Sequence, residues 1–195
     1  MTVALLAPIS ESDYRTYPVL ALPSDFTGDK VIQLLNNAWA TIEKWANQPL
    51  TAAANTDIYE FPSKQANVMA NGNLRIVPRF TPLISVTTIK NSYSIVQGGW
   101  TPVTLFDVIG DSILCYDSFF TRGDSGLLQV AYTSGYAIVP NDLKEACALM
   151  AALFLSAGFF PTQGGVGITP DWADGADRQK YYRVRQIVEL HQRKF

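Results

Sequence analysis

The sequence contains few of the residues that enzymes use for chemistry. It has one histidine, two cysteines and only 16% charged residues, against about 25% in a typical soluble domain. The histidine, His191, lies close to the C-terminus, where a helix end frays, so it is a poor catalytic base. Zinc-protease, nucleophile-elbow, CxxC and phosphate-loop patterns are all missing. We therefore expect no catalytic residues, no metal site and no cofactor.

Long hydrophobic runs are also lacking. The longest predominantly apolar stretch, 146–160, has fifteen residues, whereas a membrane span needs roughly 20. We expect instead a helix over about 142–157, with Asn141 or Asp142 as its N-cap, buried in the protein or between subunits. Cys115 and Cys147 stand in apolar surroundings without metal or redox spacing, which indicates buried free thiols. No membrane association is expected.

Hydrophobic periodicity divides the rest of the chain into helical and β-rich parts. A helix is predicted over 28–47, capped by Ser24 or Thr27 and ended by Pro49, and a last helix from about 172 to the end. Between them lie short β-branched and aromatic runs separated by glycine turns, which predict antiparallel strands at 57–61, 74–77, 83–90, 103–106, 112–116 and 127–132. The fold class is therefore α+β.

Charge is distributed unevenly along the chain. The net charge is −2, yet residues 178–195 carry six basic side chains against Glu189, which gives +5 there and −7 before it. Arg178, Arg183 and Arg185 belong to this basic end. Three interpretations stay open: a solvated helix end, a docking surface for an acidic partner, or a lining that faces DNA. The overall acidity argues against a free nucleic-acid binder.

A glycine-rich segment, PTQGGVGITP, precedes the last helix at 161–170. It holds Gly164, Gly165 and Gly167 between two prolines, a composition typical of a loop. Such a loop can become ordered against a partner at an entropic cost. We therefore count these three glycines, with the arginines of the basic end, as docking candidates.

The most specific pattern runs from the last strand into the apolar helix. Residues 130–146 read V-x-Y-T-x-G-Y-x-x-V-P-x-D-L-K-E-A, and residues 79–86 read R-x-x-P-x-x-x-V. Gly135 permits a turn with positive φ, Tyr136 can pack at the junction and Pro140 fixes the backbone before the helix. With Tyr132 and Asp142 these residues predict a rigid strand-to-helix corner.

These two patterns together resemble the head-tail connector (adaptor) proteins of tailed bacteriophages. The resemblance covers about residues 79–157 and implies a helical adaptor domain, 1–50 and 137–195, with about three main helices. Because short members of that family are nearly all helical, residues 51–136 would be an inserted antiparallel β domain. The role of this insertion stays open.

The resemblance also implies a structural role without bond chemistry. Such adaptors form a homo-oligomeric ring, usually twelvefold, below the portal protein in the virion neck. The ring joins the capsid to neck or tail completion proteins, and DNA passes through its channel without specific binding. Assembly would occur in the host cytoplasm, and the isolated chain could be a monomer. Ring contacts would come from the apolar helix, with Leu149, Leu153 and Phe154 as candidates.

Two functions of other classes stay open on the residues alone. One is a β-rich module of the virion that binds a receptor or glycan through exposed aromatic side chains, namely Trp100, Tyr116, Phe119 and Phe120. The other is a hydrolase that uses two carboxylates among Asp107, Asp117 and Asp124, because carboxylate separation is a tertiary property.

Overall fold

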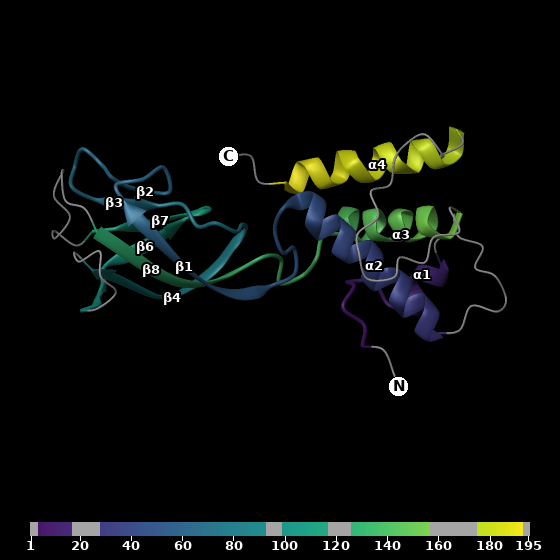
Figure 1. Cartoon of the computed structure of the whole chain (residues 1–195), viewed down its shortest axis with the longest axis horizontal. Coiled ribbons are helices and arrows are strands. Elements are labelled where there is room, and N and C mark those ends of the chain that lie inside the picture. The colour runs from purple at the N-terminus through teal and green to yellow at the C-terminus, as the bar shows by residue number, and fades with distance from the viewer. Residues whose placement is uncertain (1–3, 17–27, 93–98, 117–125, 157–174, 193–195) are drawn as a thin grey trace. The chain divides into compact units, whose positions relative to one another are not determined.

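The chain has an α+β fold, as the sequence predicted, in a computed structural model (Figure 1) that describes residues 4–16, 28–92, 99–116, 126–156 and 175–192. It divides into two units. One consists of Met1–Gln48 and Ile138–Phe195 and holds the four helices of the described residues. The other, Pro49–Ala137, holds the eight strands found in those residues. We call them the helical unit and the β unit.

The helical unit is built from α1 (Glu11–Thr16), α2 (Gly28–Ala46), α3 (Asn141–Ser156) and α4 (Gly175–His191). One stripe of α2 is buried, and its members follow the three-and-four spacing of a helix face: Val31, Leu34, Leu35, Ala38, Trp39, Ile42 and Ala46. The central helix α3 contacts both α2 and α4, which explains why it is apolar on nearly all sides. The predicted buried helix is thus confirmed.

A left-handed residue, and not the proline after it, ends α2. Asn47 has a φ of 55° and donates its N–H to the carbonyl of Lys44 (3.3 Å), while Gln48 N donates to Glu43 O (3.3 Å). These two bonds form a Schellman motif, in which asparagine replaces the usual glycine. The helix boundary was predicted within one residue, whereas its proposed caps, Ser24 and Thr27, lie outside the described residues.

The β unit contains two four-stranded antiparallel sheets, ordered β1-β8-β4-β5 and β2-β3-β7-β6. Their strands are β1 (Ala53–Phe61), β2 (Ala66–Val68), β3 (Leu74–Ile76), β4 (Leu83–Ser92), β5 (Thr101–Pro102), β6 (Phe106–Ile109), β7 (Ser112–Cys115) and β8 (Gly126–Ser134). Strand β8 pairs with β1 on one side and with β4 on the other. It therefore forms the centre of the first sheet.

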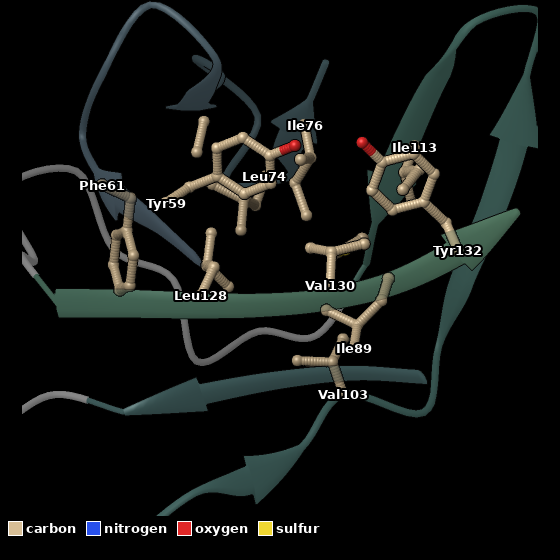
Figure 2. Close-up of a cluster of buried hydrophobic side chains, with 12 residues drawn as sticks. Tyr59, Phe61, Leu74, Ile76, Ile89, Val103, Ile113, Leu128, Val130 and Tyr132 are labelled. Carbon is tan, nitrogen blue, oxygen red and sulfur yellow. The ribbon is translucent and has the colours of Figure 1, made fainter. Parts of the chain in front are cut away.

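Side chains from both sheets fill the core of the β unit (Figure 2). Its largest members come from β1, β3, β4, β7 and β8: Tyr59, Phe61, Leu74, Ile76, Ile89, Ile113, Leu128, Val130 and Tyr132. Along β8 buried and half-buried residues alternate without interruption, as expected for a strand with one face on a core. Each such side chain stabilises the fold by about 1.5–3 kcal/mol on burial.

The structure differs from the prediction at several short elements. The run 103–106 is not one strand, because β5 ends at Pro102, residues 103–105 belong to no strand and β6 begins at Phe106. Helix α1 and strand β2 were not predicted, since both are too short to show a period.

In the part of the chain that the structure describes, no helix combines the length and the apolar character needed to cross a bilayer.

Candidate functional site

The predicted corner begins where β8 ends. Gly135 has a φ of +96°, which confirms the expected positive φ. Its N–H donates to Pro82 O (2.9 Å), and Tyr136 N donates to Leu50 O (2.8 Å). Tyr136 also forms an isolated bridge with Thr51. The turn is therefore held by the segments that lead into β4 and β1, the two strands that flank β8.

No side chain fits at Gly135. A Cβ atom there would lie 2.4 Å from Thr51 O and 2.7 Å from Thr51 C, both backbone atoms. Real Cβ atoms essentially never approach that closely, and the φ by itself disfavours residues with a side chain. The glycine thus allows the chain to turn and allows two backbones to approach.

Tyr132, another corner residue, takes part in a hydrogen-bond network that the sequence did not reveal. Its hydroxyl and that of Tyr59 both donate to Oδ2 of Asp57, at 2.5 and 2.9 Å. Figure 2 shows the two hydroxyl groups pointing toward one another from β8 and β1. Burial, followed by the bond to the Asp57 carboxylate, raises the pKa of Tyr132 to about 12. Burial and the neighbouring Tyr132 and Asp57 likewise raise the pKa of Tyr59.

The same two hydroxyls also accept bonds from the backbone that leads into β4. Arg79 N donates to the Tyr59 oxygen (2.9 Å) and Phe80 N donates to the Tyr132 oxygen (3.2 Å). The Arg79 guanidinium carbon lies 5.3 Å from the centre of the Phe80 ring, within cation–π range. The network therefore fixes the R-x-x-P segment, whose arginine stays exposed. In the sequence, the only sign of this network was Asp57, an acidic residue at an inward position of β1.

The helical side of the corner is organised by Pro140 and Asp142. Lys144 N donates to Pro140 O (3.1 Å), so the first turn of α3 starts directly after the proline. Asp142 lies inside this turn and accepts from Leu143 N through Oδ1 (2.8 Å). The N-cap predicted at Asn141 or Asp142 was therefore placed too late, because the proline carbonyl already accepts the first helical bond.

Asp142 also joins α3 to the end of α4. Its Oδ2 lies 2.8 Å from Nε2 of His191, whose backbone oxygen accepts from the Gln48 side chain (2.8 Å). Partial burial raises the pKa of the Asp142 carboxyl, but hydrogen bonds from His191 and from backbone amides outweigh it and hold the pKa below its usual range. The single histidine thus links the ends of three segments, a role that the sequence analysis missed.

Much of the positive charge on α4 is paired. Arg183 contacts Glu145 of α3 at 3.1 Å, Lys180 contacts Asp177 at 2.9 Å, and Arg185 lies 4.0 Å from Glu189. Arg178 is exposed and forms no ion pair with any described residue. The basic end is therefore less positive at its surface than the sequence count indicated. Arg178 and Arg185, seven residues apart, share one exposed helix face.

The other predicted contact residues fall into two groups. Gly164, Gly165 and Gly167 lie outside the described residues. Leu153 and Phe154, proposed for contacts between subunits, are buried within the chain itself, with 0% and 5% of their surface exposed. They serve the core of the helical unit, which corrects their proposed role. Leu149 is half-buried and keeps part of its surface available.

Only some residues of the two other hypotheses lie in the described part of the chain. Asp107 is exposed on β6, whereas Asp117 and Asp124 lie outside the described residues. Trp100 is half-buried and Tyr116 exposed, whereas Phe119 and Phe120 are again outside. Over the described ranges, no group of three histidine, cysteine or acidic side chains could hold a metal ion.

Comparisons with known proteins give one family and one fold. A family model described as "HCP: Head completion protein" matches residues 7–194. Among curated proteins no match was found. A chain in "Neck of empty GTA particle computed with C6 symmetry" has 17% identity and a TM-score of 0.58, covering 100% of this chain and 94% of that one. A chain in "Virion of native gene transfer agent (GTA) particle" has 16% identity and a TM-score of 0.55, covering 93% and 92%. At such identities the two structures show a shared fold.

Proposed function

The chain belongs to the head completion protein family, and we propose that it acts as a ring of identical subunits below the portal, at the head-tail junction. Its role as a structural head-tail connector protein follows from the family, whose model covers residues 7–194. That match is the observation that carries the proposal. The ring would join the capsid to neck or tail completion proteins and leave a channel for DNA.

We assign different tasks to the two units. Helices α2, α3 and α4 would form the adaptor core, with the β unit as an inserted domain. A similar chain occurs in a neck computed with C6 symmetry, and twelve copies are compatible with such symmetry. Ring contacts would be heterologous, one face of a subunit meeting a different face of its neighbour. On the apolar helix, Leu149 remains the candidate for such a contact.

The portal would dock on the exposed face of α4. Arg178 and Arg185 project from this face with Tyr182, which has 58% of its surface exposed. Arg183 would contribute less, because its guanidinium already pairs with Glu145. The glycine segment with Gly164, Gly165 and Gly167 stays part of the proposal. Exposed charges of this kind change association rate and salt dependence more than the total affinity.

DNA would pass the ring without specific binding. The chain has a net charge of −2, and stable binding to DNA depends mainly on neutralising phosphates. Partly paired cations on α4 add little affinity of this sort. The protein would be located in the virion neck. It would assemble in the host cytoplasm, where the isolated chain could be a monomer before it joins the ring.

Charge reversal at α4 tests portal docking. The double variant Arg178→Glu with Arg185→Glu is expected to weaken binding to purified portal protein by about tenfold at low salt and by less at high salt, because added ions screen exposed charges. The triple variant that includes Arg183→Glu should weaken binding further but also places two acidic groups together at Glu145. Sedimentation with the portal over a salt series gives the measurement.

A matched variant separates this surface from net charge. Lys44→Glu changes an exposed lysine on α2, in the same unit, and alters the net charge by as much as Arg178→Glu alone; it should leave portal binding unchanged, whereas Arg178→Glu alone should weaken it. Equal binding by the wild-type chain and the double variant at every salt concentration would exclude docking through α4. The family assignment would stand, because it does not depend on this surface.

A further inference from the structure

The second sheet of the β unit is formed by β2, β3, β7 and β6 (Figure 1), and one of its faces lies on the core. On β3 the neighbours of Arg75 are buried, and on β7 the neighbours of Leu114 are buried, so both side chains point away from the core. Asn67 of β2 and Asp107 of β6 are exposed on the same side. We call this surface the outer face of the second sheet.

These four side chains form one row across the outer face. Asn67 lies opposite Arg75 on the neighbouring strand. Arg75 and Asp107 both lie opposite Leu114 of β7, one on each side of it. Since paired strands are about 4.8 Å apart, the backbones of the two charged residues are separated by about 10 Å. The row therefore carries a cation and an anion on the two sides of an apolar centre.

Large apolar side chains flank this row. Ile109 of β6 and Tyr116, directly after β7, are each two residues from a member of the row and therefore point to the same face. Ile109 has 59% of its surface exposed, and Tyr116 has 40%. Leu105, whose carbonyl accepts from Tyr116 N (2.9 Å), has 60%. Apolar groups gathered on one exposed face, with charges among them, are typical of a contact between proteins.

Neither charge of the row is neutralised within the described part of the chain. Arg75 and Asp107 form no ion pair with any residue there. Arg75 Nη2 donates to the Ser112 hydroxyl (3.1 Å), and the Tyr116 side chain is hydrogen-bonded to Asp107. These bonds orient the two charged side chains but leave their charges unpaired. A partner that presents an acid and a base in the reverse order would complement them.

A second copy of this chain presents the charges in that order. A rotation of 180° about an axis parallel to β7 turns one outer face onto another and exchanges the positions of β3 and β6. Arg75 of each copy then faces Asp107 of the other, while the two Leu114 side chains meet at the axis. An axis along the row would instead place Arg75 against Arg75 and Asp107 against Asp107. The charges therefore favour the first axis.

We infer that two copies of this chain pair through their outer faces, about a two-fold axis parallel to β7. Sheets packed face to face commonly keep their strand directions within about 30° of each other, as this axis requires. Tyr116 lies near the axis and meets the same residue of the second copy. Ile109 and Val77, directly after β3, lie at the level of Ser112 on the two sides of β7, so Ile109 of one copy faces Val77 of the other. Apolar groups thus meet in the arrangement that also pairs the charges.

This contact is small and closes on itself. β3 has three residues, and β6 and β7 have four each, so the outer face offers less area than a stable complex buries. We expect a weak dimer with a Kd on the order of 10–100 μM. A two-fold contact cannot be repeated around a ring. The pair is therefore a form of the free chain, and the inference does not depend on the proposed ring.

Charge reversal tests the arrangement. Sedimentation equilibrium of the full chain, without the portal, should show monomer and dimer and no larger species. Arg75→Asp and Asp107→Arg should each raise the Kd by about tenfold or more, because each variant puts like charges opposite one another at both ends of the row. Lys44→Asp on α2 and Glu60→Arg on β1 change the net charge by the same amounts at exposed positions outside the outer face, and should leave the Kd unchanged.

Mixing the two single variants gives the decisive result. The row of Arg75→Asp carries two acids and that of Asp107→Arg carries two bases, so every charge meets an opposite charge in a mixed pair. The equimolar mixture should therefore form dimers with a Kd within about threefold of the wild-type value, although each variant alone pairs poorly. The double variant Arg75→Asp with Asp107→Arg should pair with itself in the same way.

Lysine substitutions test the apolar part of the contact. Ile109→Lys should raise the Kd by about tenfold, because it puts a charge where apolar surface would be covered. Ile58→Lys replaces an isoleucine of β1, in the other sheet, that has 47% of its surface exposed, and should leave the Kd unchanged. Circular dichroism spectra that match the wild-type spectrum show that the variants are folded.

Three outcomes would overturn the inference. They are a wild-type chain that stays monomeric up to about 1 mM, a dimer that the mixture of variants fails to restore, and growth into trimers and larger species, which indicates a heterologous contact. None of them affects the proposed function, because portal docking is measured separately by sedimentation with the portal protein. Loss of portal binding would likewise leave the dimer standing.

Discussion

Replacing Gly135 by alanine is expected to destabilise the β unit by about 2–5 kcal/mol. A φ of +96° costs a residue with a side chain roughly 1–2 kcal/mol. The new Cβ would lie 2.4 Å from Thr51 O, a backbone atom, so relief requires movement of the chain before β1, at about 1–3 kcal/mol. For a domain of this size, the unfolding temperature measured by calorimetry should fall by roughly 10 °C or more.

Two other glycines separate the cost of the positive φ from the cost of the steric clash. Gly110 has a φ of +57°, and no atom lies within 4 Å of the position that an added Cβ would occupy, so Gly110→Ala should cost only about 1–2 kcal/mol. Gly126 has no positive φ, but its Cβ would meet Ser92 O at 2.4 Å, so Gly126→Ala reports the steric cost. If Gly135→Ala is no more harmful than Gly110→Ala, the close approach at the corner does not constrain the fold.

Three further predictions concern individual ionisable side chains: Asp57, Asp142 and Cys147. Asp57→Ala removes the acceptor of two tyrosine hydroxyls and should lower the free energy of unfolding, measured in urea, by about 1–3 kcal/mol. In a background where Tyr59 and Tyr132 are both phenylalanine, the same substitution should cost much less. The folded state lowers the pKa of the Asp142 carboxyl, so this group should contribute stability that is present above pH about 4 and is lost as the pH falls through the folded pKa. Asp142→Asn should therefore flatten this part of the acid unfolding curve. An unchanged slope would contradict the role assigned to Asp142. Burial raises the pKa of Cys147 to about 12, so a thiol reagent at pH 8 should label it only after denaturation, and rapid labelling of the native chain would refute its burial.

The elements that the sequence predicted well are those that depend on near neighbours. The stripe of α2 repeats every three to four residues, and the α3 segment is apolar on all sides, so each defines its own helix within one or two residues. The turn at Gly135 is local in the same sense. The resemblance carried by this corner predicted a connector family, and the match to head completion proteins over residues 7–194 confirmed it.

The candidate site was predicted less well, because its contacts join distant parts of the chain. Tyr132 and Asp57 are 75 residues apart, and His191 and Asp142 are 49 apart. The six cations of the basic end looked equivalent in the sequence, yet Arg183 pairs with Glu145 of another helix while Arg178 does not pair among the described residues. Leu153 and Phe154 were similarly indistinguishable from surface-facing members of their helix.

The sequence by itself therefore determined the α+β class, the main helices and the glycine corner, because backbone preference and hydrophobic period act over a few residues. Tertiary structure alone decided which side chains line up across a sheet, which tyrosines share Asp57 and which cations are neutralised. These features depend on strand register and helix packing, which bring together residues that have no influence on each other along the chain.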